Sequence, residues 1–178
     1  MATPLRRALV IVLCILLFSC VPRPAAAQIL TSWNAFAGYA YMKDLTDRID
    51  FKLGWAADAA VGLNSWLSIV ADAGGHYETV PLVGSDVRLA EHSLMAGGRA
   101  SVHVGDFVEF GQLMAGLVHA RGTAYGSTSA DTHPGVQGGG GVDYPLSPKL
   151  AVRLEFDARF LDTSREIRAT AGIVYTFR

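Results

Sequence analysis

The feature that most constrains this chain is a strict two-residue alternation near its C-terminus. From Leu150 to Phe160 every second residue is apolar, and the residues between them include Arg153, Glu155 and Asp157. Successive side chains of a β-strand point to opposite faces, whereas an α-helix repeats every 3.6 residues. The segment is therefore predicted to be a strand with one apolar and one polar face, which favours an all-β fold.

The same period recurs along the chain, with weaker contrast between the two faces. The predicted strands cover residues 33–41, 55–63, 66–76, 94–104, 108–121, 135–144, 150–160 and 166–177. Short turns at residues 64–65, 105–106 and 145–149 alternate with longer polar connections at 43–52, 78–89, 122–132 and 161–165. This regular exchange of short and long connections predicts an eight-stranded antiparallel up-and-down meander.

The first 27 residues are typical of a cleavable secretory signal peptide. Arg6 and Arg7 precede an apolar run over residues 8–18, and Ala25 to Ala27 supply the small residues of a cleavage site. The run is shorter than the roughly 20 residues that a membrane-spanning helix needs. The residues before Cys20 resemble a lipobox, so lipidation of Cys20 is an alternative to cleavage after Ala27. We expect a signal peptide at 1–27 and one exported domain at 28–178.

Charge and cysteine content exclude several classes of protein. The full chain has a formal charge of −1. Loss of Arg6, Arg7 and Arg23 with the signal peptide leaves 12 of the 15 basic residues against 16 acidic ones. This balance argues against nucleic acid as a partner. Both cysteines, Cys14 and Cys20, lie in the signal peptide, so the exported domain has neither a disulfide nor a cysteine-based redox or zinc site.

Alternation alone does not distinguish a soluble barrel from a membrane barrel, because strands alternate in both. The apolar face contains small residues such as Ala57, Ala71 and Ala169, which are too small to fill a lipocalin-like cavity. Aromatic residues, among them Trp33 and Trp55, gather near strand ends, as in the girdles of membrane barrels. We therefore predict a transmembrane β-barrel with its apolar face toward lipid. A secreted lipocalin-like binder of small ligands is the alternative.

The polar face carries charges of both signs, which can form ion pairs and hydrogen bonds inside a narrow barrel. The predicted interior network comprises Asp58, Asp72, Arg99, Glu109, Arg121, Arg153, Glu155, Asp157, Arg159, Glu166 and Arg168. The same alternation places His103 and His119 inside and leaves Gln112 as an interruption of the apolar outer face. Eight strands enclose a space that side chains can fill, so no wide pore is expected.

The last predicted strand resembles the C-terminal β-signal of bacterial outer-membrane proteins. Residues 171–177 read AGIVYTF, with Gly172, Tyr175 and Phe177 at the motif positions, although Ala171 and Arg178 depart from it. Residues 35–41, AFAGYAY, are similar to the first strand of OmpA-like and OmpX-like barrels. The resemblance implies an eight-stranded barrel in the bacterial outer membrane, surrounded by its lipid and folded by the barrel assembly machinery. We expect a monomer, and the sequence identifies no external ligand.

Catalytic, cofactor and metal sites are not predicted. A lipid A deacylase needs a serine, a histidine and a carboxylate on the lipid-facing wall, but Ser101, His103 and His119 have the alternation of the polar face. His92 has no carboxylate on its own face. The five histidines lack the close spacing of metal ligands, and residues 138–141 lack the lysine and helix of a phosphate-binding loop. We predict a non-enzymatic protein with a structural or surface-interaction role. A lipid A-modifying enzyme is the less favoured alternative.

Overall fold

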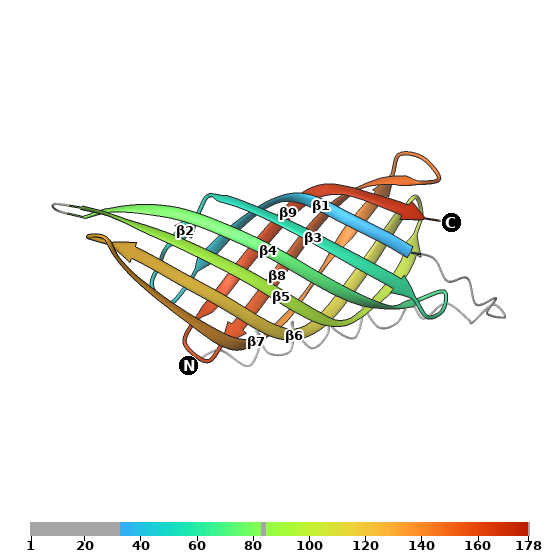
Figure 1. The fold of residues 1–178 in the computed structure, drawn as a ribbon. Coiled ribbons are helices and arrows are strands. Elements are labelled where there is room, and N and C mark those ends of the chain that lie inside the picture. The colour runs from blue at the N-terminus through green and yellow to red at the C-terminus, as the bar shows by residue number, and fades with distance from the viewer. Residues whose placement is uncertain (1–32, 83–84, 178) are drawn as a thin grey trace, which may run out of the picture.

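The chain folds into one β-sheet that closes on itself as a barrel of long, inclined strands (Figure 1). The computed structural model describes residues 33–82 and 85–177. The predicted signal peptide and Cys20 lie outside the described residues. No helix in the described part of the chain has the length and apolar character needed to span a bilayer.

Eight strands form the barrel wall, and every neighbouring pair is antiparallel. A ninth, β2, is a two-residue strand that precedes β3 on the same side of β1. The strands are β1 (Trp33–Asp44), β2 (Asp50–Phe51), β3 (Leu53–Gly62), β4 (Leu67–Leu82), β5 (Ser85–Val104), β6 (Phe107–Ala124), β7 (Ser127–Pro145), β8 (Leu150–Leu161) and β9 (Arg165–Phe177). The prediction of an eight-stranded up-and-down barrel is confirmed.

The barrel closes between β1 and β9 through an antiparallel ladder that starts at the Trp33–Phe177 pair and runs the length of β1. Near the middle of this ladder Gly38 lies opposite Gly172. A Cβ atom on either glycine would overlap the backbone of the facing strand. The two strands therefore approach closely where the first and last parts of the chain meet.

The two ends of the barrel differ. Residues 63–66, 105–106 and 146–149 connect strands at one end, which we call the short-turn end, and β1 begins and β9 ends there. Gly105 has a positive φ of 60° in one of these turns. The opposite end, the long-hairpin end, carries the β4–β5 and β6–β7 hairpins. Tyr125 and Gly126 both have positive φ values, typical of a two-residue hairpin turn between β6 and β7.

Strands β4 to β7 are longer than predicted. Residues 78–89 and 122–132, expected to be polar loops, continue as paired strands up to the Leu82–Ser85 and Ala124–Ser127 pairs. Figure 1 shows these four strands extending past the rest of the barrel at its left end. Several β-branched residues, among them Thr79, Val80 and Val87, favour this conformation, and the neighbouring strand satisfies the backbone groups. We call residues 78–82, 85–90 and 121–134 the projecting sheet.

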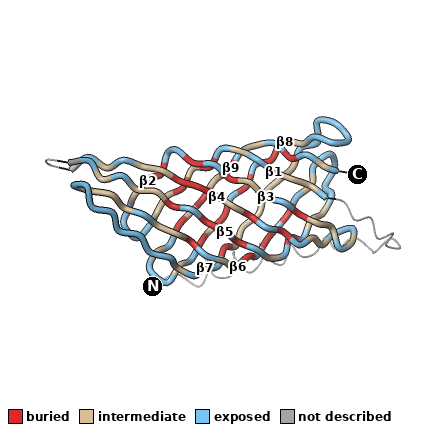
Figure 2. The backbone as a smooth tube through the Cα atoms, viewed as in Figure 1, coloured by how far each residue is buried: buried red, intermediate tan, exposed pale blue. Residues whose placement is uncertain are grey.

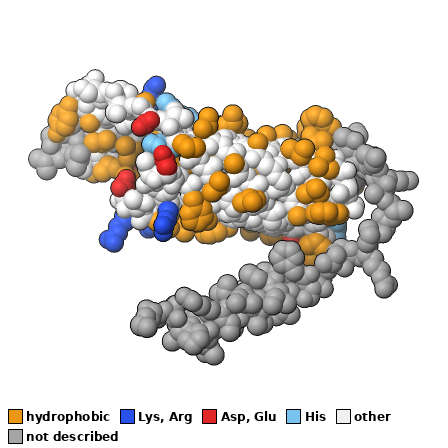
Figure 3. Space-filling view, turned by 90° about the horizontal axis from the view of Figure 1, so that it is seen from below, with side chains coloured by type: hydrophobic (Ala, Val, Ile, Leu, Met, Phe, Trp, Pro, Cys, Tyr) orange, Lys and Arg blue, Asp and Glu red, His pale blue; other side chains and the backbone are white. Residues whose placement is uncertain are grey.

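Side-chain exposure separates the two faces of the wall. On β8, Leu154 and Phe156 are 56% and 57% exposed, whereas Arg153 and Glu155 are 1% and 4% exposed. Buried and exposed positions alternate along the strands (Figure 2). Figure 3 shows apolar side chains over the middle of the barrel's outer surface and charged ones gathered at the long-hairpin end. The apolar face points outward, as predicted for a membrane barrel. The lipocalin-like alternative, which requires the reverse orientation, is wrong.

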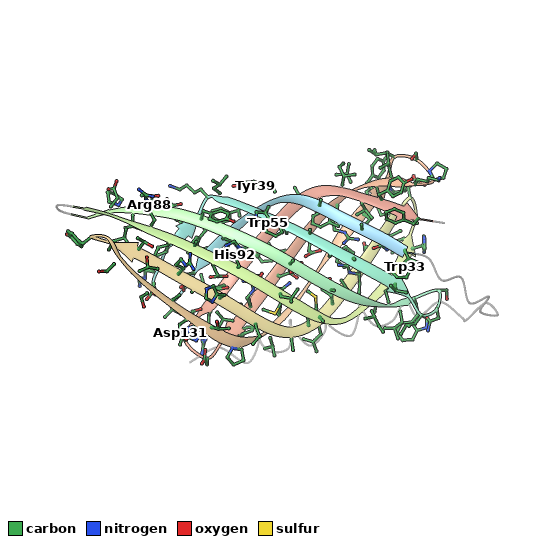
Figure 4. The ribbon with its side chains drawn as sticks, viewed as in Figure 1. Trp33, Tyr39, Trp55, Arg88, His92 and Asp131 are labelled. Carbon is green, nitrogen blue, oxygen red and sulfur yellow. The ribbon has the colours of Figure 1, made fainter. Side chains whose placement is uncertain are left out.

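Aromatic side chains lie near both borders of the apolar outer band. Trp33 and Phe107 are exposed at the short-turn end, where the ring of Phe107 packs 5.3 Å from that of Tyr144. Toward the other end, Tyr39 lies opposite Trp55 and donates a hydrogen bond to the carbonyl of Lys52 (Figure 4). The tryptophan and tyrosine rings combine an apolar body with one polar atom, which suits the border between hydrocarbon and water.

Candidate functional site: the charged interior

The candidate site is the interior of the barrel, which inward side chains from several strands fill. On β8 and β9 the register pairs Asp157 with Arg168 and Arg159 with Glu166, so charged residues of both strands share the inner face. Arg153, Arg159 and Arg168 are among the largest fully buried side chains of the described residues. We define the lumen network as Asp58, Asp72, Glu91, Ser93, Arg99, Gln112, Gln137, Asp143, Arg153, Glu155, Asp157, Arg159, Glu166 and Arg168.

Near the short-turn end, two arginines share one carboxylate. Arg99 and Arg153 each place a guanidinium nitrogen 2.7 Å from Oδ2 of Asp58. Arg153 also donates two hydrogen bonds to Asp143, at 2.7 and 2.8 Å. The ring of Phe110 lies 4.6 Å from Arg99 and 4.5 Å from Arg153. Carboxylate and aromatic partners together offset the cost of removing the two guanidinium groups from water.

The centre of the interior is organised by Arg168. Its guanidinium donates two hydrogen bonds of 2.9 Å to the carboxylate of Asp72 across the barrel. It also lies 2.9 Å from Asp157 and 3.2 Å from Glu155. Gln112 extends the cluster by donating to Asp157 at 3.0 Å. Arg168 of β9 thus joins β4 and β8 directly, and Asp157 extends the cluster to Gln112 of β6.

Arg159 forms the layer nearest the long-hairpin end. It lies 2.7 Å from Glu91 on β5 and 3.2 Å from Glu166 on β9. Ser93 and Gln137 accept further hydrogen bonds from the same guanidinium, each at 3.2 Å. A guanidinium has five N–H donors, and this arrangement directs them to oxygen atoms of four side chains and to the sulfur of Met42 at 3.8 Å.

The opposite part of the interior is apolar. Met95, Met114 and Val118 from β5 and β6 pack with Val70 and Ala60, and all are nearly or fully buried. Flexible methionine side chains fill irregular space well. The barrel interior therefore has an ionic side, lined mainly by β8 and β9, and an apolar side, lined mainly by β5 and β6.

Two residues that were predicted to join the network face outward. Glu109 and Arg121 are exposed, and the register places them on the outer face of β6. The prediction was wrong because β6 carries apolar residues on both faces. Its two charged residues therefore indicated the wrong face as the inner face. Both of them lie near strand ends, where an outward charge can reach water. The other predicted members are buried inside: Asp58, Asp72, Arg99, Arg153, Glu155, Asp157, Arg159, Glu166 and Arg168.

The reversed orientation of β6 also explains the position of Gln112, which was predicted to interrupt the apolar outer face. Gln112 points inward and accepts hydrogen bonds from Arg99 at 2.9 and 2.8 Å. A polar side chain in the middle of a spanning strand was the available signal. Glu91 and Ser93 were not predicted as members, because they precede the predicted strand at residues 94–104, whereas β5 begins at Ser85.

The histidines weighed for hydrolytic chemistry, His92, His103 and His119, have no carboxylate partner in the described part of the chain, whereas His133 places Nδ1 3.0 Å from Asp162. His119, expected inside, faces outward, and its Nδ1 lies 2.9 Å from the hydroxyl of Thr132. His92 lies opposite His119 and packs edge-on against Tyr77 at 5.6 Å. His103 is exposed at the short-turn end. No group of His, Cys, Asp or Glu among the described residues could hold a metal ion.

A cavity of about 280 Å³ opens at the long-hairpin end of the interior. Its lining includes the acidic residues Asp44, Asp47, Glu91 and Asp131 and the ring of Phe51. Glu91 also binds Arg159, so the floor of this cavity adjoins the lumen network. Arg121 also lines the cavity, so the opening carries more acidic than basic residues, whereas the layers beneath it contain paired charges.

One carboxylate beyond the outer aromatic residues has a shifted pKa. Asp50 lies 3.1 Å from the Lys43 ammonium and accepts a 3.0 Å hydrogen bond from Tyr41. The contact with Lys43, followed by the one with Tyr41, lowers the pKa of Asp50 below its ordinary value.

Comparisons with known proteins identify the family. Residues 11–177 match the family model described as outer membrane protein beta-barrel domain. Neisserial surface protein A is 17% identical, with 86% of this chain and 100% of that chain covered and a TM-score of 0.65. For Ail, the attachment invasion locus protein of Yersinia pestis, identity is 16%, coverage 83% and 99%, and the TM-score 0.64.

The N-terminal β-barrel domain of Pseudomonas aeruginosa OprF is a further structural neighbour, at 15% identity and a TM-score of 0.57, with 85% of this chain and 99% of that chain covered. No curated protein matches the sequence. The closed eight-stranded barrel, its apolar outer band and the family match agree on a place in the bacterial outer membrane. The chain belongs to the outer membrane protein beta-barrel domain family.

Proposed function

We propose that this barrel is non-enzymatic and has a closed interior, and that it serves a structural or surface-interaction role. The observation that supports this is the set of guanidinium–carboxylate contacts across the lumen centre, above all those of Arg168 with Asp72 and Asp157. An eight-stranded barrel encloses a space just wide enough for side chains, whereas porins use about sixteen strands. In this proposal the projecting sheet is the part available to other molecules outside the cell.

The proposal includes the route to the membrane. Residues 1–27 act as a cleaved signal peptide, and the barrel assembly machinery recognises β9 through Gly172, Tyr175 and Phe177. Tyr175 and Phe177 point outward, and their rings pack 4.7 Å apart, which supports a shared recognition surface. The closed wall leaves no free strand edge within the membrane, which supports a monomer.

Conductance tests the closed interior. The purified barrel in planar lipid bilayers is expected to give no wide-pore conductance, whereas Arg153→Ala combined with Arg168→Ala is expected to increase ion leakage. Arg165→Ala, an exposed arginine at the start of β9, is the matched control. Stable porin-sized conductance of the unaltered protein would contradict the proposal. An altered lipid A mass profile in expressing cells would contradict its non-enzymatic part.

A further inference from the structure

The outer surface of β5 and β6 changes character abruptly toward the long-hairpin end. Leu94 and Leu117 lie opposite each other, are 66% and 56% exposed, and belong to the apolar band. The next outward positions are His92 and His119, which also lie opposite each other. Hydrocarbon contact therefore ends on both strands between these two rows.

Two arginines follow on the same outer face. Arg121 is the next outward residue of β6 after His119, and Arg88 lies two outward positions beyond His92 on β5. Arg88 pairs with Thr123, which places Arg121 diagonally across from it, within reach of a shared ligand. Figure 4 shows Arg88 nearer than His92 to the end of the projecting sheet. We call Arg88, His92, His119 and Arg121 the outer basic patch.

Hydroxyl groups surround this patch. Thr79 and Thr123 lie on either side of Arg88 in the ladder, and Thr123 contacts Thr128 at 3.1 Å. Arg88 and Arg121 are exposed, and neither guanidinium forms an ion pair with a carboxylate in the described part of the chain. The lumen arginines are all paired with carboxylates, so these two cations differ from them in being available to a ligand.

The position of the patch fits the polar layer of a membrane. Arg121 is four residues beyond Leu117, or about 13 Å along the strand, and less along the membrane normal because strands of such barrels are tilted. A long arginine side chain can also bend back toward the lipid surface. An anion held here would thus belong to a molecule whose chains contact Leu94 and Leu117.

We propose that the outer basic patch binds the phosphate of a phosphorylated lipid headgroup in the outer leaflet. Arg88 and Arg121 supply planar donors that match phosphate oxygens, and the surrounding threonines supply hydrogen bonds to the rest of the headgroup. The proposal depends on the membrane location of the barrel and not on the closed interior.

Native mass spectrometry of the barrel in detergent, titrated with diphosphoryl lipid A or with fully dephosphorylated lipid A, tests this directly. The phosphorylated lipid is expected to bind more tightly, and added salt is expected to reduce the difference. Arg88→Gln combined with Arg121→Gln is expected to weaken binding of the phosphorylated lipid by about tenfold to thirtyfold. Arg48→Gln combined with Arg165→Gln removes the same charge from exposed sites elsewhere at the long-hairpin end and is expected to leave binding unchanged.

Equal binding of the two lipids would overturn the proposal, and so would equal weakening by the two double variants. The heat-modifiable gel shift of each variant shows whether the barrel is folded. A folded Arg88→Gln, Arg121→Gln variant with unchanged affinity would therefore overturn the lipid site while leaving the proposed function intact. High bilayer conductance together with tighter binding of the phosphorylated lipid would contradict the closed interior while leaving the lipid site intact.

Discussion

The β8–β9 wall and the β5–β6 wall face the same interior with different chemistry. On β8 and β9, Arg153, Asp157 and Arg168 are buried in ion pairs. On β5 and β6, Met95 and Met114 fill the space by packing, with few charges among them. A barrel interior therefore need not be uniformly polar: charges require partners at fixed positions, and apolar side chains occupy the remaining volume.

The largest test of this contrast is removal of the central cation. Arg168→Met is expected to lower the free energy of unfolding by about 3–5 kcal/mol, because Asp72 and Asp157 would remain buried with their main partner gone. Urea unfolding in lipid vesicles measures the change. Arg165→Met, at an exposed site on the same strand, is the control and is expected to have little effect. A similar decrease in the free energy of unfolding for both variants would mean that the buried ion pairs of Arg168 do not stabilise the ionic wall.

The apolar wall predicts a different pair of results. Met114→Ala is expected to cost about 2–4 kcal/mol of unfolding free energy, because it leaves a cavity inside the barrel. Leu113→Ala, on the neighbouring outward position, is expected to cost less because lipid fills the vacated space. Leu113 is 70% exposed, whereas Met114 is 2% exposed. If Leu113→Ala were the more damaging change in the same unfolding assay, the orientation of β6 would be reversed.

A smaller effect is expected for Glu155→Ala. Glu155 lies 3.2 Å from Arg168, but that arginine keeps Asp72 and Asp157, so the loss should be about 1–3 kcal/mol. The melting temperature in detergent, followed by the heat-modifiable gel shift, should decrease by less than for Arg168→Met. Glu109→Ala, on the outer face, serves as the control. An unchanged melting temperature would mean that Glu155 has no stabilising part in the ionic wall.

The smallest effect concerns an exposed ion pair, which sets the scale for the buried ones. Lys43→Gln is expected to raise the pKa of Asp50 toward its ordinary value, since the contact with Lys43 is the main cause of its lowering. A carboxyl group whose pKa is lower in the folded state than in the unfolded state stabilises the fold at pH values above its unfolded-state pKa. This contribution is lost as the pH falls through the folded-state pKa. Carboxyl titration by NMR measures the shift. Lys52→Gln, which removes only a weak charge effect, should change it less.

The ionic wall could be predicted from sequence because β8 alternates clearly between charged and apolar residues. From Arg153 to Arg159 every inward position carries a charge, and every outward position in residues 150–160 is apolar, so one choice of face satisfies the whole strand. Glycine, tyrosine and phenylalanine near the C-terminus added the resemblance that indicated the outer membrane. The partners of each charge could not be predicted, because contacts such as Arg168 with Asp72 join strands 96 residues apart.

The apolar wall was harder to predict because hydropathy does not identify the inner face of β6. Phe110, Met114 and Val118 on one side resemble Leu113 and Leu117 on the other. Only Gln112 distinguished them, and its meaning became clear from its contacts with Arg99 and Asp157. The projecting sheet was not predicted because its polar, turn-forming residues are typical of loops. Its strands gain their stability mainly from pairing with one another, which the sequence pattern does not indicate.

The projecting sheet has a consequence for how this part of the protein can vary. β4 has no β3 partner beyond Tyr77, and β7 has no β8 partner before Gly135, yet the ladders among β4, β5, β6 and β7 continue. An insertion of one residue within these ladders would turn every later side chain to the opposite face. Changes of length within these ladders are therefore not tolerated, while substitutions along the strands can alter the exposed surface at constant spacing.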